Sequence, residues 1–196
     1  MEFRIVDDFL NISQADAIEN FLVEGGFPWY FRDNLNEHTQ LGNYYFNHTF
    51  LEEGEMCSDF IDILNDMASL IPVDPTKGYT RIKANLYPRT HLRVHHKSHT
   101  DYSKGDNQFT CLYYVNTNNG YTIIDGKKKI KSKKNRAIFF DGSLLHHSTT
   151  CTDVNYRCSI NFSCMRLGVN WNPFEALPKD SNVSVSAVLP DDAIIL

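Results

Sequence analysis

The sequence lacks any long apolar run, and this absence excludes a helical membrane protein. None of its hydrophobic stretches approaches the ~18 residues that a membrane-spanning helix needs, although hydrophobic residues make up 42% of the 196 positions. Charged residues account for 22% and aromatic residues for 13%, which excludes a disordered or collagen-like chain. The length suits one folded unit, so we expect a single domain over residues 1–196.

Cysteines are few and form no CxxC pair, so a thiol-rich metal site or a redox motif is not indicated. The first ten residues, MEFRIVDDFL, contain an acidic pair where a signal peptide would carry basic residues and an apolar core. An odd number of cysteines without an export signal indicates reduced thiols, and we expect a cytoplasmic protein. We interpret all five as small buried apolar side chains: Cys57, Cys111, Cys151, Cys158 and Cys164.

Charge is unevenly distributed along the chain. The net charge is −5, yet seven of the 19 basic residues lie within Lys127–Arg136. Because these seven contribute +7, the other 186 residues carry −12. This segment, here called the basic run, has two interpretations. It is either an edge strand that uses charge against edge-to-edge pairing or a cationic rim for an acidic partner, nucleic acid or acidic peptide.

The first 78 residues have the pattern of a supporting layer. A strand is predicted at 3–6, followed by a helix over 11–23, with Asn11 as N-cap and Gln14 completing a capping box. Ala15, Ile18 and Leu22 would form the buried stripe of this helix. Apolar residues at helical spacing predict a second helix over about 56–70.

From residue 79 to 166 the pattern changes to short strands rich in Val, Ile, Tyr, Phe and Thr, separated by turn-forming residues. Asp125-Gly126 between YTII and KKKIK is a strong hairpin signal, so the basic run should form the returning strand. Residues 167–196 lose periodicity, and we expect an extended arm that packs on the body or on a second subunit. The sequence therefore predicts a mainly β fold with supporting helices.

His99-Thr100-Asp101 is the starting point for chemistry. Residues i and i+2 at a strand end point to the same face, so the imidazole and the carboxylate can reach one ion. His146-His147 follows a strand and turn that would bring a third ligand alongside. Two histidines and one carboxylate form the facial triad typical of non-haem Fe(II). Arg157, ten residues beyond His147, would offer a bidentate fork to a carboxylate near the metal.

These residues resemble those of the 2-oxoglutarate- and Fe(II)-dependent dioxygenases, in particular the prolyl-4-hydroxylase-like group, which includes small versions common in bacteriophage genomes. A phage-encoded protein in a host cytoplasm would fit that likeness. The resemblance covers about residues 79–165 and rests on several short motifs that occur in the right order. They are Tyr87-Pro88, His99-Thr100-Asp101, TCLYYVN at 110–116, Asn119-Gly120, NRAIFF at 135–140, His147-Ser148 and Arg157.

The resemblance implies a double-stranded β-helix, also called a jelly roll or cupin-like fold. It implies that Fe(II) is bound by His99, Asp101 and His147, with 2-oxoglutarate as cosubstrate and dioxygen as oxidant; ascorbate is a candidate addition. Arg157 would then pair with the distal carboxylate of 2-oxoglutarate. Two tyrosines complete the implied cosubstrate site: Tyr113, as a hydroxyl donor to that carboxylate, and Tyr87, as part of the pocket wall.

The implied reaction couples decarboxylation of 2-oxoglutarate to succinate and CO2 with hydroxylation of a substrate, and a peptidyl proline or another protein residue is the expected target. One alternative is the same chemistry on a nucleobase, reached through the basic run, or on a small metabolite. Another is a non-catalytic cupin-like module that binds a metal or ligand. Two departures leave the substrate open: Gly120-Tyr121-Thr122 replaces the usual Gly-Gly-Thr, and Arg157 stands where collagen-type members have Lys.

Overall fold

The computed structural model describes residues 3–33 and 44–166, so the predicted arm over 167–196 lies outside the described residues. In the described part, no helix is long and apolar enough to cross a membrane. The elements are, in chain order, β1 (Phe3–Val6), α1 (Ile12–Val23), β2 (Tyr30–Arg32), β3 (Tyr45–Glu52), β4 (Glu55–Met56), the 3-10 helix η1 (Asp59–Leu64), α2 (Asn65–Leu70), β5 (Tyr79–Pro88), β6 (Gln108–Tyr114), β7 (Tyr121–Ile124), β8 (Lys128–Lys131), β9 (Arg136–Phe140), β10 (His146–Ser148) and β11 (Tyr156–Met165).

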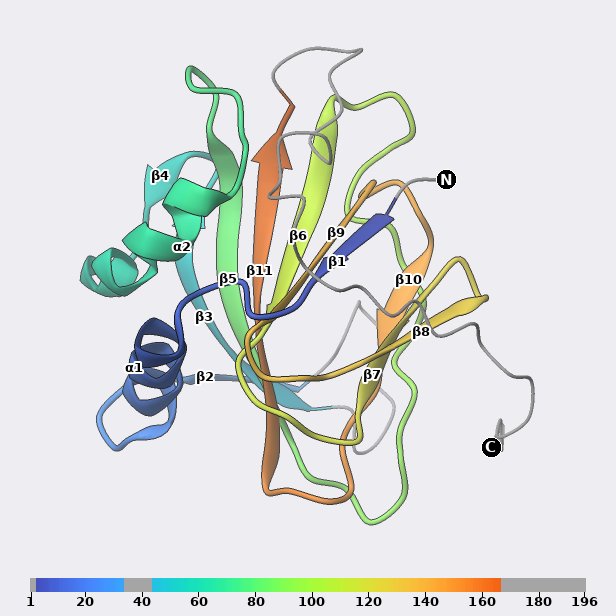
Figure 1. Cartoon of the computed structure of the whole chain (residues 1–196). Helices are drawn as coiled ribbons and strands as arrows, with labels where there is room; N and C mark the ends of the chain where they lie inside the picture. Colours follow the sequence, from blue (N-terminus) through green and yellow to red (C-terminus); the bar gives the residue numbers. More distant parts are fainter. Residues whose placement is uncertain (1–2, 34–43, 167–196) are drawn as a thin grey trace.

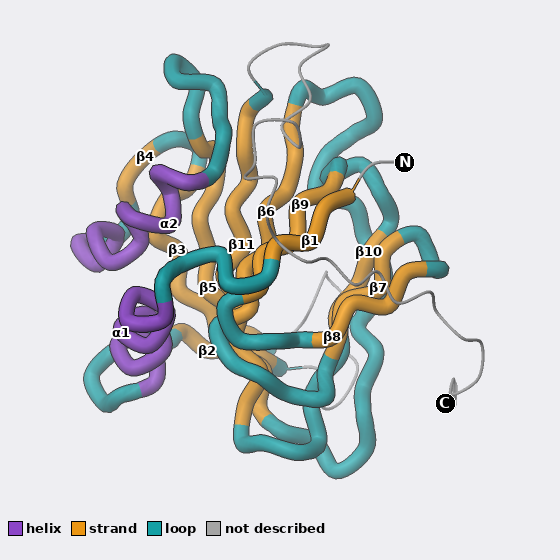
Figure 2. Tube along the Cα trace, in the orientation of Figure 1, coloured by secondary structure: helices purple, strands orange, loops and turns teal. Residues whose placement is uncertain are grey.

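Two antiparallel sheets form the body of the molecule. The large sheet has the order β1-β9-β6-β11-β5-β3-β2, with β4 paired to β3, and the small sheet has the order β10-β7-β8. The helices α1 and α2 lie on one side of the large sheet and the small sheet lies on the other (Figures 1 and 2). Crossovers between distant strands, such as β6 beside β11, give the jelly-roll arrangement that the sequence led us to expect.

Strand alternation divides the large sheet into two faces. On β11 the even-numbered residues, such as Cys158 and Phe162, are buried in the core beneath the helices. The odd-numbered residues Arg157, Ser159 and Asn161 point the other way and line a pocket. Because successive side chains on a strand alternate between faces, one strand contributes both to the apolar core and to a polar cavity.

The predicted strand at 3–6 and the first helix are confirmed. The side chain of Asn11 accepts a hydrogen bond from the backbone N–H of Gln14 at 2.9 Å, and the capping box is complete. Ala15, Ile18 and Leu22 are buried against the large sheet, as the apolar stripe predicted.

The predicted helix over 56–70 begins later than expected. Glu53 and Gly54 adopt positive φ angles of 52° and 81°, so the chain turns back and Met56 pairs with β3 as part of β4. A 3-10 turn capped by Ser58 follows, and only Asn65–Leu70 is α-helical. Local turn geometry therefore replaced the first half of the helix that periodicity indicated.

The Asp125-Gly126 hairpin is confirmed. Both residues have positive φ angles, 54° and 63°, and β7 pairs with β8 in antiparallel register. The backbone N–H of Lys127 donates to the carbonyl of Ile124 at 3.2 Å and closes the turn. The first part of the basic run is thus a returning strand in the small sheet.

The second part of the basic run is bound to acidic residues near the N-terminus. Lys133 and Arg136 both pair with Asp7, at 3.2 and 2.5 Å, and Lys134 pairs with Asp16 at 2.6 Å. These contacts attach the loop before β9 to the segment around β1 and α1. Three of the seven basic residues therefore hold the chain together internally, which reduces the cationic rim available to an acidic partner.

Candidate metal centre

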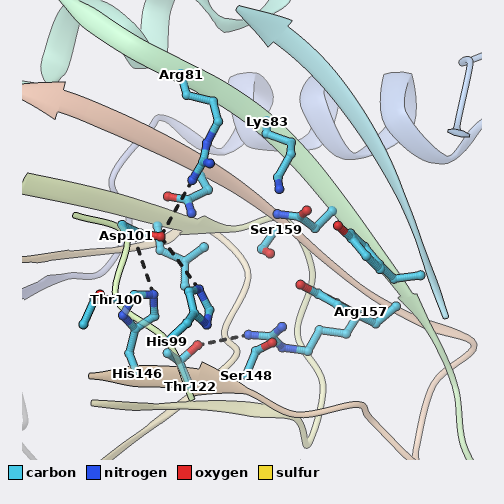
Figure 3. Close-up of a pocket in the computed structure, with 15 residues that line it drawn as sticks. Arg81, Lys83, His99, Thr100, Asp101, Thr122, His146, Ser148, Arg157 and Ser159 are labelled. Carbon is cyan, nitrogen blue, oxygen red and sulfur yellow. Dashed lines mark hydrogen bonds and ion pairs between the residues drawn. The ribbon is translucent and has the colours of Figure 1, made fainter. Parts of the chain in front are cut away.

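Two neighbouring side chains, His99 and Asp101, meet a third that is distant in sequence, His146. One ligand atom from each of His99, Asp101 and His146 lies within 4.8 Å of the other two. The Nε2 atoms of the two histidines lie 3.7 and 3.6 Å from the carboxylate oxygens of Asp101 (Figure 3). Two imidazoles and one carboxylate in this arrangement match the donor set of a facial triad, which leaves coordination positions open on the ion.

Backbone hydrogen bonds bring these residues together. His99 and His146 form an isolated antiparallel bridge with reciprocal N–H···O bonds of 2.9 Å. The N–H of Asp101 donates to the carbonyl of Gly142 at 2.8 Å. A Cβ added at Gly142 would collide with the ring of Tyr102, so the close approach of these loops requires glycine there.

The side chains are held in the orientation that a metal needs. Nδ1 of His146 and Nδ1 of His99 lie 2.9 and 3.4 Å from backbone carbonyls two residues earlier, and a carbonyl can only accept, so each Nδ1 carries the proton. Each Nε2 lone pair is then directed toward Asp101. The hydroxyl of Thr110 donates to Asp101 Oδ2 at 2.6 Å and fixes the carboxylate. Burial, and then the neighbouring His146, lower the pKa of His99, which favours the neutral ligand form.

The predicted ligand His147 is not part of this cluster. Successive residues of β10 face opposite ways, so His146 and Ser148 point into the pocket and His147 points out. Nδ1 of His147 contacts the hydroxyl of Ser98 at 2.9 Å, and its Nε2 lies 3.3 Å from Nδ1 of His95. Burial lowers the pKa of His147 to about 4. The structure thus brings His146, and not His147, together with His99 and Asp101.

A cavity of about 410 Å³ adjoins the cluster (Figure 3). Its walls come from β3, β5, β6, β7, β10 and β11, together with the loop that carries His99 and Asp101. Most of its lining is polar, and the residues are Tyr45, Arg81, Lys83, Asn85, Tyr87, His99, Thr100, Asp101, Leu112, Thr122, His146, Ser148, Arg157, Ser159 and Asn161.

Arg157 is fully buried at one end of this cavity, as the sequence led us to expect. Its Nε donates to Ser132 Oγ at 2.9 Å and its Nη2 to Thr122 Oγ1 at 3.1 Å. The guanidinium also lies over the rings of Tyr87 and Tyr114, at 5.6 and 5.4 Å from their centroids. Among the residues that the structure describes, Nη1 has no hydrogen-bond partner. A buried cation with an unused donor is costly unless an anion completes it, and a carboxylate does so with good geometry.

Gly120 makes room for this arginine. A Cβ added there would lie 2.7 Å from Cδ of Arg157 and 3.1 Å from the carbonyl oxygen of Thr150. The φ angle of Gly120 is not in the left-handed region, so the requirement is one of space. The Asn119-Gly120 turn noted in the sequence therefore shapes the wall behind the guanidinium.

The two predicted tyrosines lie in different places. Tyr87 lines the cavity, and burial raises its pKa to about 12. Tyr113 faces the helix-side core instead, where its hydroxyl lies 3.3 Å from Asn135 Oδ1. The expected contact of Tyr113 with a cosubstrate in this cavity is thus not supported, because strand alternation turns Tyr114 toward the cavity side and Tyr113 away from it.

Several lining residues were not predicted as site residues. Arg81, Lys83 and Asn85 precede Tyr87 at intervals of two on β5, and all of them point into the cavity. This polar alternation within TRIKANLYP was a readable signal, because every second residue of a strand shares a face. Burial, with Arg81 alongside, lowers the pKa of Lys83 to about 8.

No curated protein matches the sequence significantly. Among solved structures, a prolyl hydroxylase from Trichoplax adhaerens, in complex with a hypoxia-inducible-factor peptide, superposes with a TM-score of 0.57 at 18% identity over 83% of each chain. A Pseudomonas putida prolyl-4-hydroxylase gives 0.56 at 11% over 84% of this chain and 92% of its own. The α-ketoglutarate-dependent epimerase SnoN from nogalamycin biosynthesis gives 0.60 at 11% over 97% and 91%. At these identities the likeness establishes the shared double-stranded β-helix fold.

A family model matches part of the sequence. Residues 82–163 match the 2OG-Fe(II) oxygenase superfamily, and this stretch contains the His99, Asp101 and His146 cluster and Arg157. The donor set fits an iron ion, and the guanidinium of Arg157, whose Nη1 donor is unused among the described residues, fits a dicarboxylate cosubstrate. The match over residues 82–163 and the site within it together indicate a 2-oxoglutarate-dependent oxygenase that uses Fe(II) and 2-oxoglutarate.

Proposed function

We propose that His99, Asp101 and His146 hold the Fe(II) ion and that Arg157 binds the distal carboxylate of 2-oxoglutarate. The observation that carries the second assignment is the Nη1 donor of Arg157, which is buried beside the cavity and has no partner. Iron and 2-oxoglutarate supply the oxidising power for hydroxylation of a C–H bond, with succinate and CO2 as the other products.

The role of the protein in this reaction is positioning. Carbonyls behind the two Nδ1 atoms and the hydroxyl of Thr110 hold the three ligand groups toward one point. Thr122, Ser132 and two tyrosine rings fix the guanidinium of Arg157, so little side-chain entropy is lost when a carboxylate binds. Leu112 adds an apolar side chain to the otherwise mostly polar lining of the cavity.

For the substrate, we infer hydroxylation of a protein residue, with a peptidyl proline as the first candidate. The likeness to two prolyl hydroxylases, one of them solved with a bound peptide, supports this class. A small metabolite is the second candidate, because the fold is equally similar to that of SnoN, an epimerase of nogalamycin biosynthesis. A nucleobase is less favoured, since three of the seven residues of the basic run are engaged in internal ion pairs.

The test begins with conversion of 2-oxoglutarate to succinate by the purified protein, which should require added Fe(II) and should be lost in Asp101→Ala. Arg157→Ala should raise the KM for 2-oxoglutarate by roughly 100-fold, because one bidentate charge-assisted contact is removed. Binding of Mn(II), followed by electron paramagnetic resonance, should stay unchanged in that variant. The matched control is Arg89→Ala, whose side chain is exposed.

Unchanged 2-oxoglutarate affinity in Arg157→Ala would overturn its assignment, and iron-dependent turnover in Asp101→Ala would overturn the metal site. The substrate class is tested by incubating the holoenzyme with a proline-containing peptide library. Gain of one oxygen atom on proline, detected by mass spectrometry, supports the first candidate. Oxygen gain only in a panel of small metabolites would replace it with the second.

A further inference from the structure

Two further cations project into the same cavity, opposite Arg157. Arg81 and Lys83 lie two residues apart on β5 and enter from the wall that faces the histidines (Figure 3). Nη2 of Arg81 lies 3.7 Å from Asp101 Oδ1, and its buried Nε finds no hydrogen-bond partner within residues 3–33 and 44–166. Within the described residues, no carboxylate lies within ion-pair distance of Lys83 Nζ.

The charge of the site is not balanced by iron and 2-oxoglutarate. The lining contains three cationic side chains, Arg81, Lys83 and Arg157, and one carboxylate, Asp101. Bound Fe(II) and the 2-oxoglutarate dianion cancel each other, and ligating histidines are neutral. Two positive charges therefore remain at the half-buried wall of the cavity, where water compensates them only in part.

The wall around Lys83 is also polar. Asn161 stands directly opposite Lys83 in the register of β11 and β5, and Ser159 stands opposite Asn85. All four residues line the cavity, and Oδ1 of Asn161 has no hydrogen-bond partner. Lys83 and the amide groups of Asn85 and Asn161 can donate hydrogen bonds to an oxyanion, whereas Oδ1 of Asn161 can only accept and needs a donor such as an N–H of the ligand.

We propose that Arg81 and Lys83 form a subsite for a carboxylate group of the substrate. This inference rests on the proposed function, in which Arg157 is occupied by 2-oxoglutarate. The subsite holds a substrate that carries its carboxylate a short distance from the carbon to be hydroxylated. An acidic residue close to the target position of a peptide and the acid group of a small metabolite are two sources of the same chemistry.

The test uses acetate as the probe, with acetamide as its neutral isostere. The protein, labelled with 13C in its lysine side chains, is loaded with Zn(II) and saturating 2-oxoglutarate, so that the cosubstrate site is filled and no turnover occurs. The 13Cε resonance of Lys83 is identified by its absence from the spectrum of Lys83→Met. Added acetate should shift this resonance in a saturable manner. Acetamide should require at least ~10-fold higher concentration, because it lacks the charge that strengthens the hydrogen bonds.

Two variants sharpen the result. Arg81→Met should weaken acetate binding while the KM for 2-oxoglutarate stays within about twofold, and Arg157→Met should do the opposite. Lys127→Met is the matched control, because that side chain is 83% exposed at the hairpin turn. The proposal is overturned if acetate causes no saturable shift of the Lys83 signal. It is also overturned if Lys83→Met raises the KM for 2-oxoglutarate as strongly as Arg157→Met does.

The source of the carboxylate follows from two more probes on the same signal. Tighter binding of acetyl-Gly-Asp-Gly-amide than of 3-phenylpropionate supports an acidic peptide, and the reverse order supports a small acid. The control peptide acetyl-Gly-Asn-Gly-amide lacks the carboxylate. If it binds as tightly as the Asp-containing peptide, the proposed carboxylate subsite is contradicted. Absence of iron-dependent succinate formation would overturn the proposed function itself, whereas intact turnover without an acetate response overturns the subsite alone.

Discussion

The two faces of the large sheet are built from the same strands but do different work. Beneath α1 and α2, β11 contributes Ile160 and Phe162 to a continuous apolar core, and both side chains are fully buried. On the opposite face the same strand contributes Arg157, Ser159 and Asn161 to the cavity. Because neighbouring residues of a strand face opposite sides of the sheet, one residue of β11 stabilises the core and the next lines the cavity.

The two faces also differ in how their polar groups are satisfied. In the described residues, six buried side-chain polar atoms lack a hydrogen-bond partner, and three of them belong to residues that line this cavity: Arg81 Nε, Arg157 Nη1 and Asn161 Oδ1. Buried polar groups in folded proteins are normally paired. Two unpaired donors and one unpaired acceptor in one cavity therefore point to ligands, while the helix-side core needs none.

The largest difference in activity is expected between variants of the two adjacent histidines of β10, His146 and His147. His146→Ala should abolish iron-dependent succinate formation, a loss of more than ~100-fold, because it removes a ligand rather than its support. His147→Ala should keep most of the activity, since its ring contacts His95 and Ser98 outside the cluster. Steady-state turnover and Mn(II) binding of the two variants check this. Greater loss in His147→Ala would restore the assignment made from sequence.

This pair shows what the sequence could and could not supply. The types of ligand, the His99-Thr100-Asp101 motif and the approximate position of the third ligand were all predictable from spacing. The choice between His146 and His147 depends on the pairing of β10 with β7, and a shift by one residue exchanges the faces. A short strand of three residues carries too little alternation to reveal its own register.

The second prediction compares two neighbours on β11. Phe162→Ala should lower the free energy of unfolding by about 3–5 kcal/mol, because it leaves a cavity in the helix-side core. Asn161→Ala on the cavity face should cost less than ~1 kcal/mol, since its Oδ1 has no partner to lose. Urea unfolding followed by fluorescence measures both values. Similar losses for the two variants would break the proposed division between faces.

The same alternation explains the misplaced tyrosine. The TCLYYVN run correctly predicted a buried strand, but nothing in it distinguished the face of Tyr113 from that of Tyr114, because both positions are fully buried and aromatic. By contrast, the capping box of α1 and the Asp125-Gly126 turn were predicted correctly, since each depends on residues within four positions. Local signals were readable, and those that depend on sheet register were not.

The third prediction concerns acid stability on the cavity side. His96 is buried against Tyr87, with its Nδ1 2.7 Å from the hydroxyl of Ser148, and burial lowers its pKa to about 3. Between pH 6.5 and 3 the unfolded chain binds a proton here that the folded chain does not, so this group lowers stability as the pH falls. The loss due to His96 should be about 2 kcal/mol at pH 5 relative to pH 7.

Urea unfolding at the two pH values measures this term. His96→Gln keeps a polar side chain but cannot titrate, so the difference in stability between pH 7 and pH 5 should shrink by about that 2 kcal/mol. Wild type and His96→Gln with the same pH dependence would show that the ring is not held neutral in the folded state.

The smallest expected effect tests whether space alone shapes the cosubstrate wall. In Gly120→Ala the new Cβ would lie 2.7 Å from Cδ of Arg157, 2.8 Å from Oδ1 of Asn118 and 3.1 Å from the carbonyl oxygen of Thr150, so the side chains of Arg157 and Asn118 must move. We expect a loss of stability of about 1 kcal/mol and a several-fold rise in the KM for 2-oxoglutarate, since the guanidinium no longer lies between its two tyrosine rings. Gly25→Ala is the control, because a Cβ there meets nothing within 4 Å. If Gly120→Ala lowers the stability but leaves the KM for 2-oxoglutarate unchanged, the cavity face tolerates displacement of Arg157. The two faces of the large sheet would then differ less than their polarity indicates.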